Sequence, residues 1–183
     1  EAGMTLDALQ RELGHRGQWL SLDPAHAEEA TVGGILSSNA AGPRRHLYGS
    51  CRDLLIGVTV VTAAGSIVKG GGKVVKNVAG YDLPKLFIGA FGTLGVIVEA
   101  TVKLRPRPDA DRLVIARFAR LKEAGAAARA VMGSDLLPSA LDLLDGEALR
   151  ALGQGGADGA ALLIGIDGIP EQVEWQCAEV ERL

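Results

Sequence analysis

Apolar residues near the start of the chain recur at the spacing of one helix face. Leu6, Leu9 and Leu13 stand at positions i, i+3 and i+7. Thr5 precedes them as a suitable N-cap, and Gly14 follows them as a helix stop. This pattern predicts a short amphipathic helix.

The next hydrophobic segments are too short for helices and predict strands. Residues 18–22 form the first, which Asp23-Pro24 ends because proline cannot donate to a strand ladder. Residues 54–62 form a continuous apolar strand, and residues 66–69 return from a turn at 63–65, which predicts a hairpin. The polar, partly basic segment 43–53 between these strands is predicted to be a loop.

A glycine-punctuated stretch, residues 70–104, follows the hairpin. Its triple glycine, Gly70 to Gly72, predicts a turn. A second turn at residues 89–95 carries glycines at three-residue spacing, where another chain segment or a ligand can approach the backbone closely. The alternating strand after it is expected to place five residues on one face: Val96, Val98, Ala100, Val102 and Leu104.

The texture changes at Arg105-Pro-Arg-Pro108, which marks a boundary. Beyond it the patterns predict a strand, a helix, a strand, a short helix, a strand and a closing helix, at residues 113–118, 121–132, 140–144, after 145, 161–167 and 170–183. That order predicts a ferredoxin-like domain without its last strand. The fold class is therefore α+β, with one domain over residues 1–108 and a partial second domain over residues 109–183.

Composition excludes several function classes. The 183 residues are 48% hydrophobic and 22% charged, as in globular proteins, and the net charge is −3. Nucleic-acid binding relies on phosphate neutralisation by Lys and Arg and on base stacking, so this charge and the 4% aromatic content argue against it. No stretch approaches the roughly 20 apolar residues that span a bilayer.

The positions of the cysteines and histidines give little support for a metal site or a reactive thiol. Cys51 and Cys177 stand far apart without a CxxC motif. His15, His26 and His46 show no metal-ligand spacing, which predicts no metal site. A loop role for Cys51 is favoured over a reactive thiol.

The common sequence motifs of nucleotide-binding proteins and hydrolases are absent. Gly72-Lys73 is followed by Val74 and not by Ser or Thr, so no Walker A loop is present. Gly89, Gly92 and Gly95 have the spacing G-x-x-G-x-x-G, which differs from the Rossmann fingerprint. No G-x-S-x-G elbow occurs. By contrast, residues 31–42 combine a Gly-Gly pair with small residues, which suits ligand contacts by main-chain amides.

Four segments occur in an order that resembles a known family: Thr31-Val-Gly-Gly34 with Ser38-Asn39, Gly49-x-x-Arg52-Asp53, Lys76-Asn-Val-Ala-Gly-Tyr-Asp82, and Phe91-Gly-Thr-Leu-Gly-Val-Ile97. Together they resemble the second subdomain of the PCMH-type FAD-binding domain in the vanillyl-alcohol-oxidase family. Over residues 20–108 the chain is similar to the FAD-binding subunits of bacterial glycolate oxidases. Related dehydrogenases and catalytic subunits carry an acidic residue where this chain has Phe91, which favours the accessory FAD subunit.

The resemblance implies a set of FAD contacts. The residues placed along the flavin are Asp23, Pro24, Thr31, Val32, Gly33 and Gly34. Those placed near the ring and the ribityl chain are Ser37, Ser38, Asn39 and Gly42. Those placed on the adenine side are Gly95, Val96 and Ile97. In this family a glycine-rich loop wraps the pyrophosphate, and Gly70 to Gly72 come too late in the chain to be that loop. We therefore expect the loop upstream of Glu1, and expect this chain to be a fragment that is inactive and binds FAD weakly or not at all.

The implied activity is flavin-dependent oxidation of a small 2-hydroxy acid, glycolate, by hydride transfer to FAD. The implied partners are a catalytic flavin subunit and an iron–sulfur subunit, in the cytoplasm or at a membrane through those subunits. The catalytic base is not identified; His46 and Tyr48 are available, and Arg44 and Lys76 are candidates for electrostatic roles. Two alternatives remain: a D-lactate dehydrogenase-like flavoprotein, and a non-catalytic subunit that holds FAD for assembly.

Overall fold

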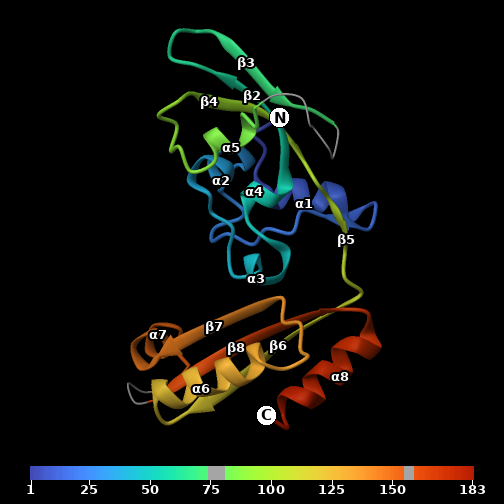
Figure 1. Ribbon diagram of the computed structural model, residues 1–183, viewed down its shortest axis with the longest axis vertical. Coiled ribbons are helices and arrows are strands. Elements are labelled where there is room, and N and C mark those ends of the chain that lie inside the picture. The colour runs from blue at the N-terminus through green and yellow to red at the C-terminus, as the bar shows by residue number, and fades with distance from the viewer. Residues whose placement is uncertain (74–80, 155–158) are drawn as a thin grey trace. The chain divides into compact units, whose positions relative to one another are not determined.

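A computed structural model describes residues 1–73, 81–154 and 159–183 (Figure 1). The chain divides into two compact units, Glu1–Arg107 (unit 1) and Pro108–Leu183 (unit 2). Each contains a three-stranded antiparallel sheet. The mixture of helix and sheet confirms the α+β class.

Unit 1 combines five helices with two small sheets in the residues described. The helices are α1 (Leu6–Gly14), α2 (Val32–Ser38), α3 (Arg45–Tyr48), α4 (Cys51–Leu54) and α5 (Pro84–Phe87). The strands are β1 (Gln18–Trp19), β2 (Leu55–Val61), β3 (Ile67–Gly71), β4 (Val96–Val102) and β5 (Arg105–Pro106). The larger sheet has the order β3-β2-β4, and β1 pairs with β5.

The core of unit 1 lies on one side of the larger sheet. Val58 and Val60 of β2 are buried there together with Ile35 and Leu36 of α2. α2 packs against β4, and α5 packs against β2. The predicted N-terminal helix is confirmed: the Thr5 hydroxyl accepts a hydrogen bond from the Ala8 amide, and Leu9 packs against the core.

A β-bulge in β4 overturns the predicted face assignment. Thr59 pairs with Glu99 and Val60 pairs with Ile97, so Val98 is an extra residue in the ladder. Because one extra residue exchanges the two faces, Ile97 is buried, whereas Val96 is 65% exposed. The prediction that Val96 lies on the same face as Ala100 and Val102 is therefore wrong, because the bulge separates them; Ala100 and Val102 pack on the core.

The strand predicted for residues 18–22 is shorter than expected. Only Gln18 and Trp19 pair, and their partner β5 consists of two residues that include a proline. The backbone of Leu20 bonds instead to the Gln10 side chain, which accepts from the amide at 3.1 Å and donates to the carbonyl at 2.6 Å. A glutamine of α1 thus replaces the next rung of the ladder.

The predicted loop at residues 43–53 contains two short helices, α3 and α4. A capping box begins α4: Asp53 accepts from the Ser50 amide at 2.7 Å, while the Ser50 hydroxyl accepts from the helix amides. At the other end, the Lys85 ammonium donates to the carbonyls of Arg52 and Leu55. These side-chain caps explain why α4 is helical, whereas α3 has no side-chain cap at its start.

The triple glycine is also corrected, because Gly70 and Gly71 continue β3 and pair with Val58 and Gly57. At Gly71 the backbone φ is +67° and a Cβ would lie 2.1 Å from the Ile56 carbonyl oxygen. Glycine at this position therefore allows two strands to approach each other. The predicted hairpin of β2 and β3 is confirmed.

Unit 2 follows its predicted element order closely. Its elements are β6 (Ala110–Phe118), α6 (Leu121–Met132), β7 (Ala140–Asp145), α7 (Gly146–Ala151), β8 (Ala160–Gly168) and α8 (Pro170–Val180). α8 ends three residues before the predicted end. The sheet order β6-β8-β7 confirms a ferredoxin-like arrangement of three strands.

The core of unit 2 lies between the sheet and two helices (Figure 1). Leu162, Ile164 and Ile166 of the central strand β8 are almost fully buried beneath Val131 of α6 and Val173 of α8. Alternation at period two on β8 and the 3.6-residue period on the helices account for this packing.

Candidate functional site

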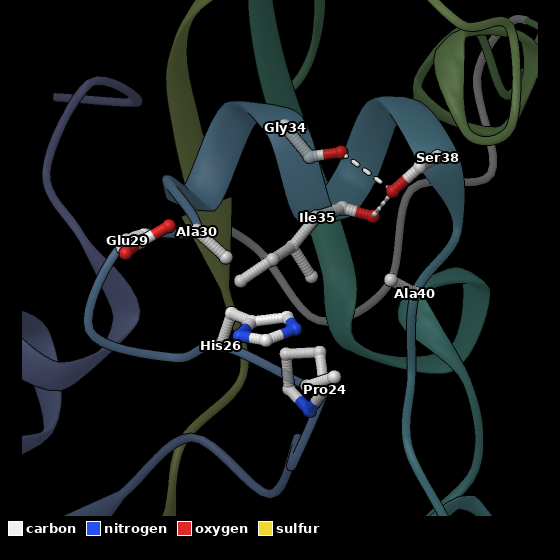
Figure 2. A pocket seen from close by; sticks show the side chains of 9 residues that line it. Pro24, His26, Glu29, Ala30, Gly34, Ile35, Ser38 and Ala40 are labelled. Atoms are coloured by element: carbon white, nitrogen blue, oxygen red, sulfur yellow. Dashed lines mark hydrogen bonds between the residues drawn. The ribbon is translucent and has the colours of Figure 1, made fainter.

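A pocket of about 410 Å³ lies in unit 1 between α2 and the segment that precedes it (Figure 2). Pro24 and His26 form one side, and Gly34, Ile35 and Ser38 of α2 form the other. The hydroxyl of Ser38 donates to the Gly34 carbonyl at 2.8 Å. Except for His26, Glu29 and Ser38, the lining groups are apolar or lack a side chain, as in pockets for planar organic ligands.

The amides at the start of α2 are occupied by the protein itself. Val32 donates to the Met4 carbonyl at 2.9 Å, and Gly33 donates to the Ala2 carbonyl at 2.8 Å. The Gly34 amide donates to the Thr31 hydroxyl at 3.1 Å. These three groups therefore hold α2 in place and are not available to a phosphate.

At two of the predicted FAD-lining positions, neighbouring chain segments leave no room for a side chain, so glycine is required. A Cβ on Gly33 would lie 3.2 Å from the Ala2 carbonyl oxygen and 3.3 Å from that of Ile97. Gly42 has φ +76°, and a Cβ there would lie 2.1 Å from the Asp23 carbonyl oxygen. Their immediate role is close packing of the loops that shape the site.

Asp23 organises the loop after Gly42. Its carboxylate accepts from the Arg44 amide at 3.1 and 3.3 Å and lies 3.6 Å from the Arg44 guanidinium. The same guanidinium lies over the Trp19 ring at 5.3 Å, and Tyr48 meets that ring edge-on at 5.2 Å. The Arg105 guanidinium lies over the Tyr48 ring, again at 5.3 Å. Arg44 and Tyr48 thus belong to an ordered cation–π cluster.

The predicted adenine-side residues lie elsewhere in unit 1. Val96 and Ile97 line an open hollow of about 640 Å³ together with Ile67 and Lys69 of β3. The hydroxyl of Thr59 donates to the Glu99 carboxylate at 2.9 Å beside it. Gly95 has φ +148°, and a Cβ at this residue would lie 2.6 Å from Cγ1 of Val60. Glycine therefore allows close packing against Val60.

The structure therefore brings some of the thirteen predicted residues together and separates others. Pro24, Gly34 and Ser38 share the pocket, and Val96 and Ile97 share the hollow. Asn39 closes α2 in a left-handed conformation with φ +56°. The sequence reasoning missed the pocket residues Ala25, His26, Glu29, Ala30, Ile35 and Ala40. The available signal was their position beside the Thr31 cap: residues 25, 26, 29 and 30 come just before it, and residues 35 and 40 lie in and just after α2.

The pocket fits a flat ring better than it fits a phosphate. Its walls are the proline and imidazole rings on one side and Gly34, Ile35 and Ser38 of α2 on the other, so the space between them is lined mainly by apolar and planar groups. Its described lining includes no lysine or arginine, and the first amides of α2 already bond within the protein. Among FAD's parts, a planar ring therefore suits this pocket better than the pyrophosphate does.

Other sequence candidates stay outside the pocket. Lys76 lies outside the described residues. Cys51 is buried, its thiol lies 3.8 Å from the Ile35 carbonyl, and burial raises the pKa of that thiol to about 11. Hydrogen bonds from Ser50 hold the pKa of Asp53 below its ordinary value. Across residues 1–73, 81–154 and 159–183, no cluster of metal-ligating side chains occurs. In the same ranges, no helix is long and apolar enough to cross a membrane.

Comparison with known families defines the class of protein. Residues 1–71 match the FAD binding domain family, and residues 107–183 match the C-terminal domain of FAD linked oxidases. The chain belongs to the FAD-linked oxidases, a family of oxidoreductases whose cofactor is FAD. The expected family and cofactor are confirmed.

Named relatives are similar over large parts of the chain. Glycolate oxidase subunit GlcD of Bacillus subtilis is 36% identical over 98% of this chain and 39% of its own length. Glycolate oxidase subunit GlcE of Escherichia coli is 45% identical over 67% of this chain and 35% of its own length. A mitochondrial D-lactate dehydrogenase of Saccharomyces cerevisiae is 32% identical over 83% of this chain and 26% of its own length. The chain thus spans well under half the length of these relatives.

Solved structures agree on the fold. Alkyldihydroxyacetonephosphate synthase superposes on all of this chain, and on 36% of its own, with a TM-score of 0.83 at 22% identity. At that identity the likeness concerns architecture alone.

Proposed function

We propose that this chain is the FAD-binding component of a flavin-dependent 2-hydroxy-acid oxidoreductase, with glycolate as the substrate. The observation that carries the proposal is the pocket, where Pro24, Gly34 and Ser38 form walls for a planar ring. Two relatives that are named as glycolate oxidase subunits support the substrate class. The whole protein acts with a catalytic flavin subunit and an iron–sulfur subunit in this proposal.

An accessory role within that complex is favoured over the catalytic one. The GlcE relative is 45% identical and the GlcD relative 36% identical, each over the part it aligns. At residue 91, where catalytic relatives are expected to carry an acidic residue, Phe91 is 75% exposed with φ +50°. Residue 91 lies beside α2, because the Phe91 amide donates to the Ser37 carbonyl at 2.9 Å. This chain therefore lacks a carboxylate at that position.

Bound FAD supplies the acceptor for the substrate's α-hydrogen, which leaves as a hydride. In this proposal, the residues of this chain bind and orient the ring. Pro24 and Ile35 cover apolar ring surface and exclude water, and Ser38 presents its oxygen as an acceptor because its hydrogen is already donated to Gly34. The thirteen residues predicted for FAD remain the proposed contacts, with Asp23, Gly33 and Gly42 acting by shaping the loops. The base that takes the hydroxyl proton is not assigned to this chain.

A D-lactate dehydrogenase-like flavoprotein is the second candidate. The yeast relative covers 83% of the chain, which favours it. An enzyme of that kind is expected to place metal-ligand histidines in its cap, and residues 109–183 contain no histidine. The third reading, a subunit that holds FAD only for assembly, predicts binding without turnover.

The test is dye reduction by the whole protein, with and without its partner subunits, on glycolate and on D-lactate. We expect FAD to be retained and glycolate to be oxidised only in the complex. A Ser38→Ala variant is expected to bind FAD less tightly, while Ser66→Ala, in the hairpin turn, serves as the matched control. Turnover of either acid by the protein alone would contradict the accessory role, and failure to bind FAD would contradict all three readings.

A further inference from the structure

His26 lies in the wall of the ring pocket, although no motif pointed to it. In Figure 2 its imidazole lies beneath Ile35 and beside the Pro24 ring. Gly34 and Ser38 line the same pocket from α2. A titratable, planar side chain therefore shares a small space with residues already proposed to contact the flavin.

The backbone at His26 is strained in a way that glycine would relieve. Its φ is +56°, a left-handed conformation that side-chain-bearing residues rarely adopt. The conformation closes a turn in which the His26 carbonyl accepts from the amides of Glu29 at 3.0 Å and Ala30 at 2.8 Å. An L-residue in this region is less stable than glycine because its Cβ approaches the neighbouring carbonyl oxygen. An imidazole kept at such a position points to a role for the side chain.

The imidazole also has unused hydrogen-bonding capacity. Within the described part of the chain it makes no hydrogen bond or ion pair, and a neutral imidazole offers one donor and one acceptor. Glu29 is the carboxylate among the lining residues, and no ion pair joins it to His26. Across the pocket, the Ser38 oxygen offers an acceptor because its hydrogen bonds to Gly34. The pocket thus presents polar groups on both sides of an apolar slot.

We propose that His26 is a positioning residue for the isoalloxazine ring of FAD, which it holds against the Gly34–Ser38 face of α2 by ring contact and one hydrogen bond. This inference rests on the proposed function and deepens it, because it names a contact that the family resemblance did not. The shared ligand chemistry is a planar heteroaromatic ring with acceptor atoms at its edge. FAD carries two such rings, and the isoalloxazine is the one assigned here.

The experiment compares His26→Asn, His26→Gly and His15→Asn in the whole protein. Asn tolerates the left-handed backbone and removes the ring, Gly relieves the strain, and His15 is an exposed histidine outside the pocket. FAD, FMN and ADP are titrated separately by flavin fluorescence or calorimetry. We expect both His26 variants to bind FAD and FMN about tenfold more weakly, with ADP binding unchanged. The absorption band of bound flavin is expected to shift, while the melting temperature of His26→Asn and all properties of His15→Asn stay as in the parent.

Three results would overturn the inference. Equal FAD affinity and an unchanged flavin spectrum in both His26 variants would show that the imidazole is structural. Weaker ADP binding with normal FMN binding would assign the pocket to the adenine. Tighter FAD binding in His26→Gly would show that strain, not the side chain, controls the site. In each case the parent protein still binds FAD, whereas a parent that binds no flavin contradicts the proposed function itself.

Discussion

The two units of this protein use glycine differently. In unit 1, a Cβ would lie 2.1 Å from a neighbouring atom at Gly42, 2.1 Å at Gly71 and 2.6 Å at Gly95, and two of these three neighbours are backbone oxygens. Among the glycines of unit 2 that the structure describes, the tightest approach is 3.0 Å, at Gly165. Both units have an apolar core of packed side chains, but in unit 1 main chains also approach one another closely at glycines.

This difference teaches where a cofactor site comes from in the chain. The Asp23 and Gly42 loops of unit 1, which approach each other at a glycine, flank the pocket beside α2. Unit 2 buries its central strand beneath two helices, and a pocket there, beside β6 and α8, is smaller, at about 220 Å³. Substitutions that probe backbone contacts in one unit and packing in the other test this comparison.

The largest expected effect is at Gly42. Gly42→Ala would place a Cβ on the Asp23 backbone at a φ of +76°, and we expect it to lower the free energy of unfolding of unit 1 by about 4 kcal/mol. Gly65→Ala is the matched control, because Gly65 has the same φ with open space around it, and should cost about 1 kcal/mol. Urea unfolding measures both. Equal losses would show that conformation, and not contact, requires glycine at residue 42.

A packing substitution in unit 2 comes next. Ile164→Ala removes a side chain that is 1% exposed in the middle of β8, and we expect a loss of about 3 kcal/mol. Leu113→Ala, on a side chain that is 61% exposed, should cost well under 1 kcal/mol. Circular dichroism during thermal unfolding checks this. A similar loss at both positions would mean that the open face of the sheet is covered in solution.

Two helix caps separate stability from cofactor binding. Thr31→Ala in unit 1 and Asp145→Ala in unit 2 each remove a side chain that accepts from a helix amide, at 3.1 and 2.8 Å, and each should cost about 1 kcal/mol. We expect only Thr31→Ala to weaken FAD binding, because α2 forms the pocket wall. Thr31→Ser should restore both properties. If Asp145→Ala weakened FAD binding equally, the site could not be assigned to unit 1.

The smallest effect concerns pH. Burial raises the pKa of the Cys51 thiol to about 11 from an ordinary value of 9.0, so above pH 9 the unfolded chain releases this proton before the folded chain does. Stability from this group is therefore present below pH 9 and is lost as the pH rises toward 11, by about 1 kcal/mol at pH 10. The difference in unfolding free energy between the parent and Cys51→Ala, measured at pH 8 and at pH 10, isolates the contribution of this thiol. A difference that does not change with pH would contradict it.

Sequence patterns alone predicted the elements that depend on near neighbours. α6 and the hairpin of β2 and β3 were predicted because their hydrophobic periods are local properties. The family resemblance, carried by short motifs in order, predicted FAD as the cofactor and the α2 segment as part of its site. Unit 2 was the more predictable half because its strands and helices repeat without interruption.

Only the tertiary structure decided the features that depend on distant residues. Whether Val96 or Ile97 faces the core follows from the bulge at Val98, whose carbonyl accepts from the Ala2 amide at 2.9 Å. The strand after Trp19 stops because Gln10 occupies the backbone of Leu20. His26 enters the pocket because its turn closes before α2. A local pattern records which side chains alternate, but contacts between segments far apart in the chain determine which groups are already bonded and which remain for a ligand.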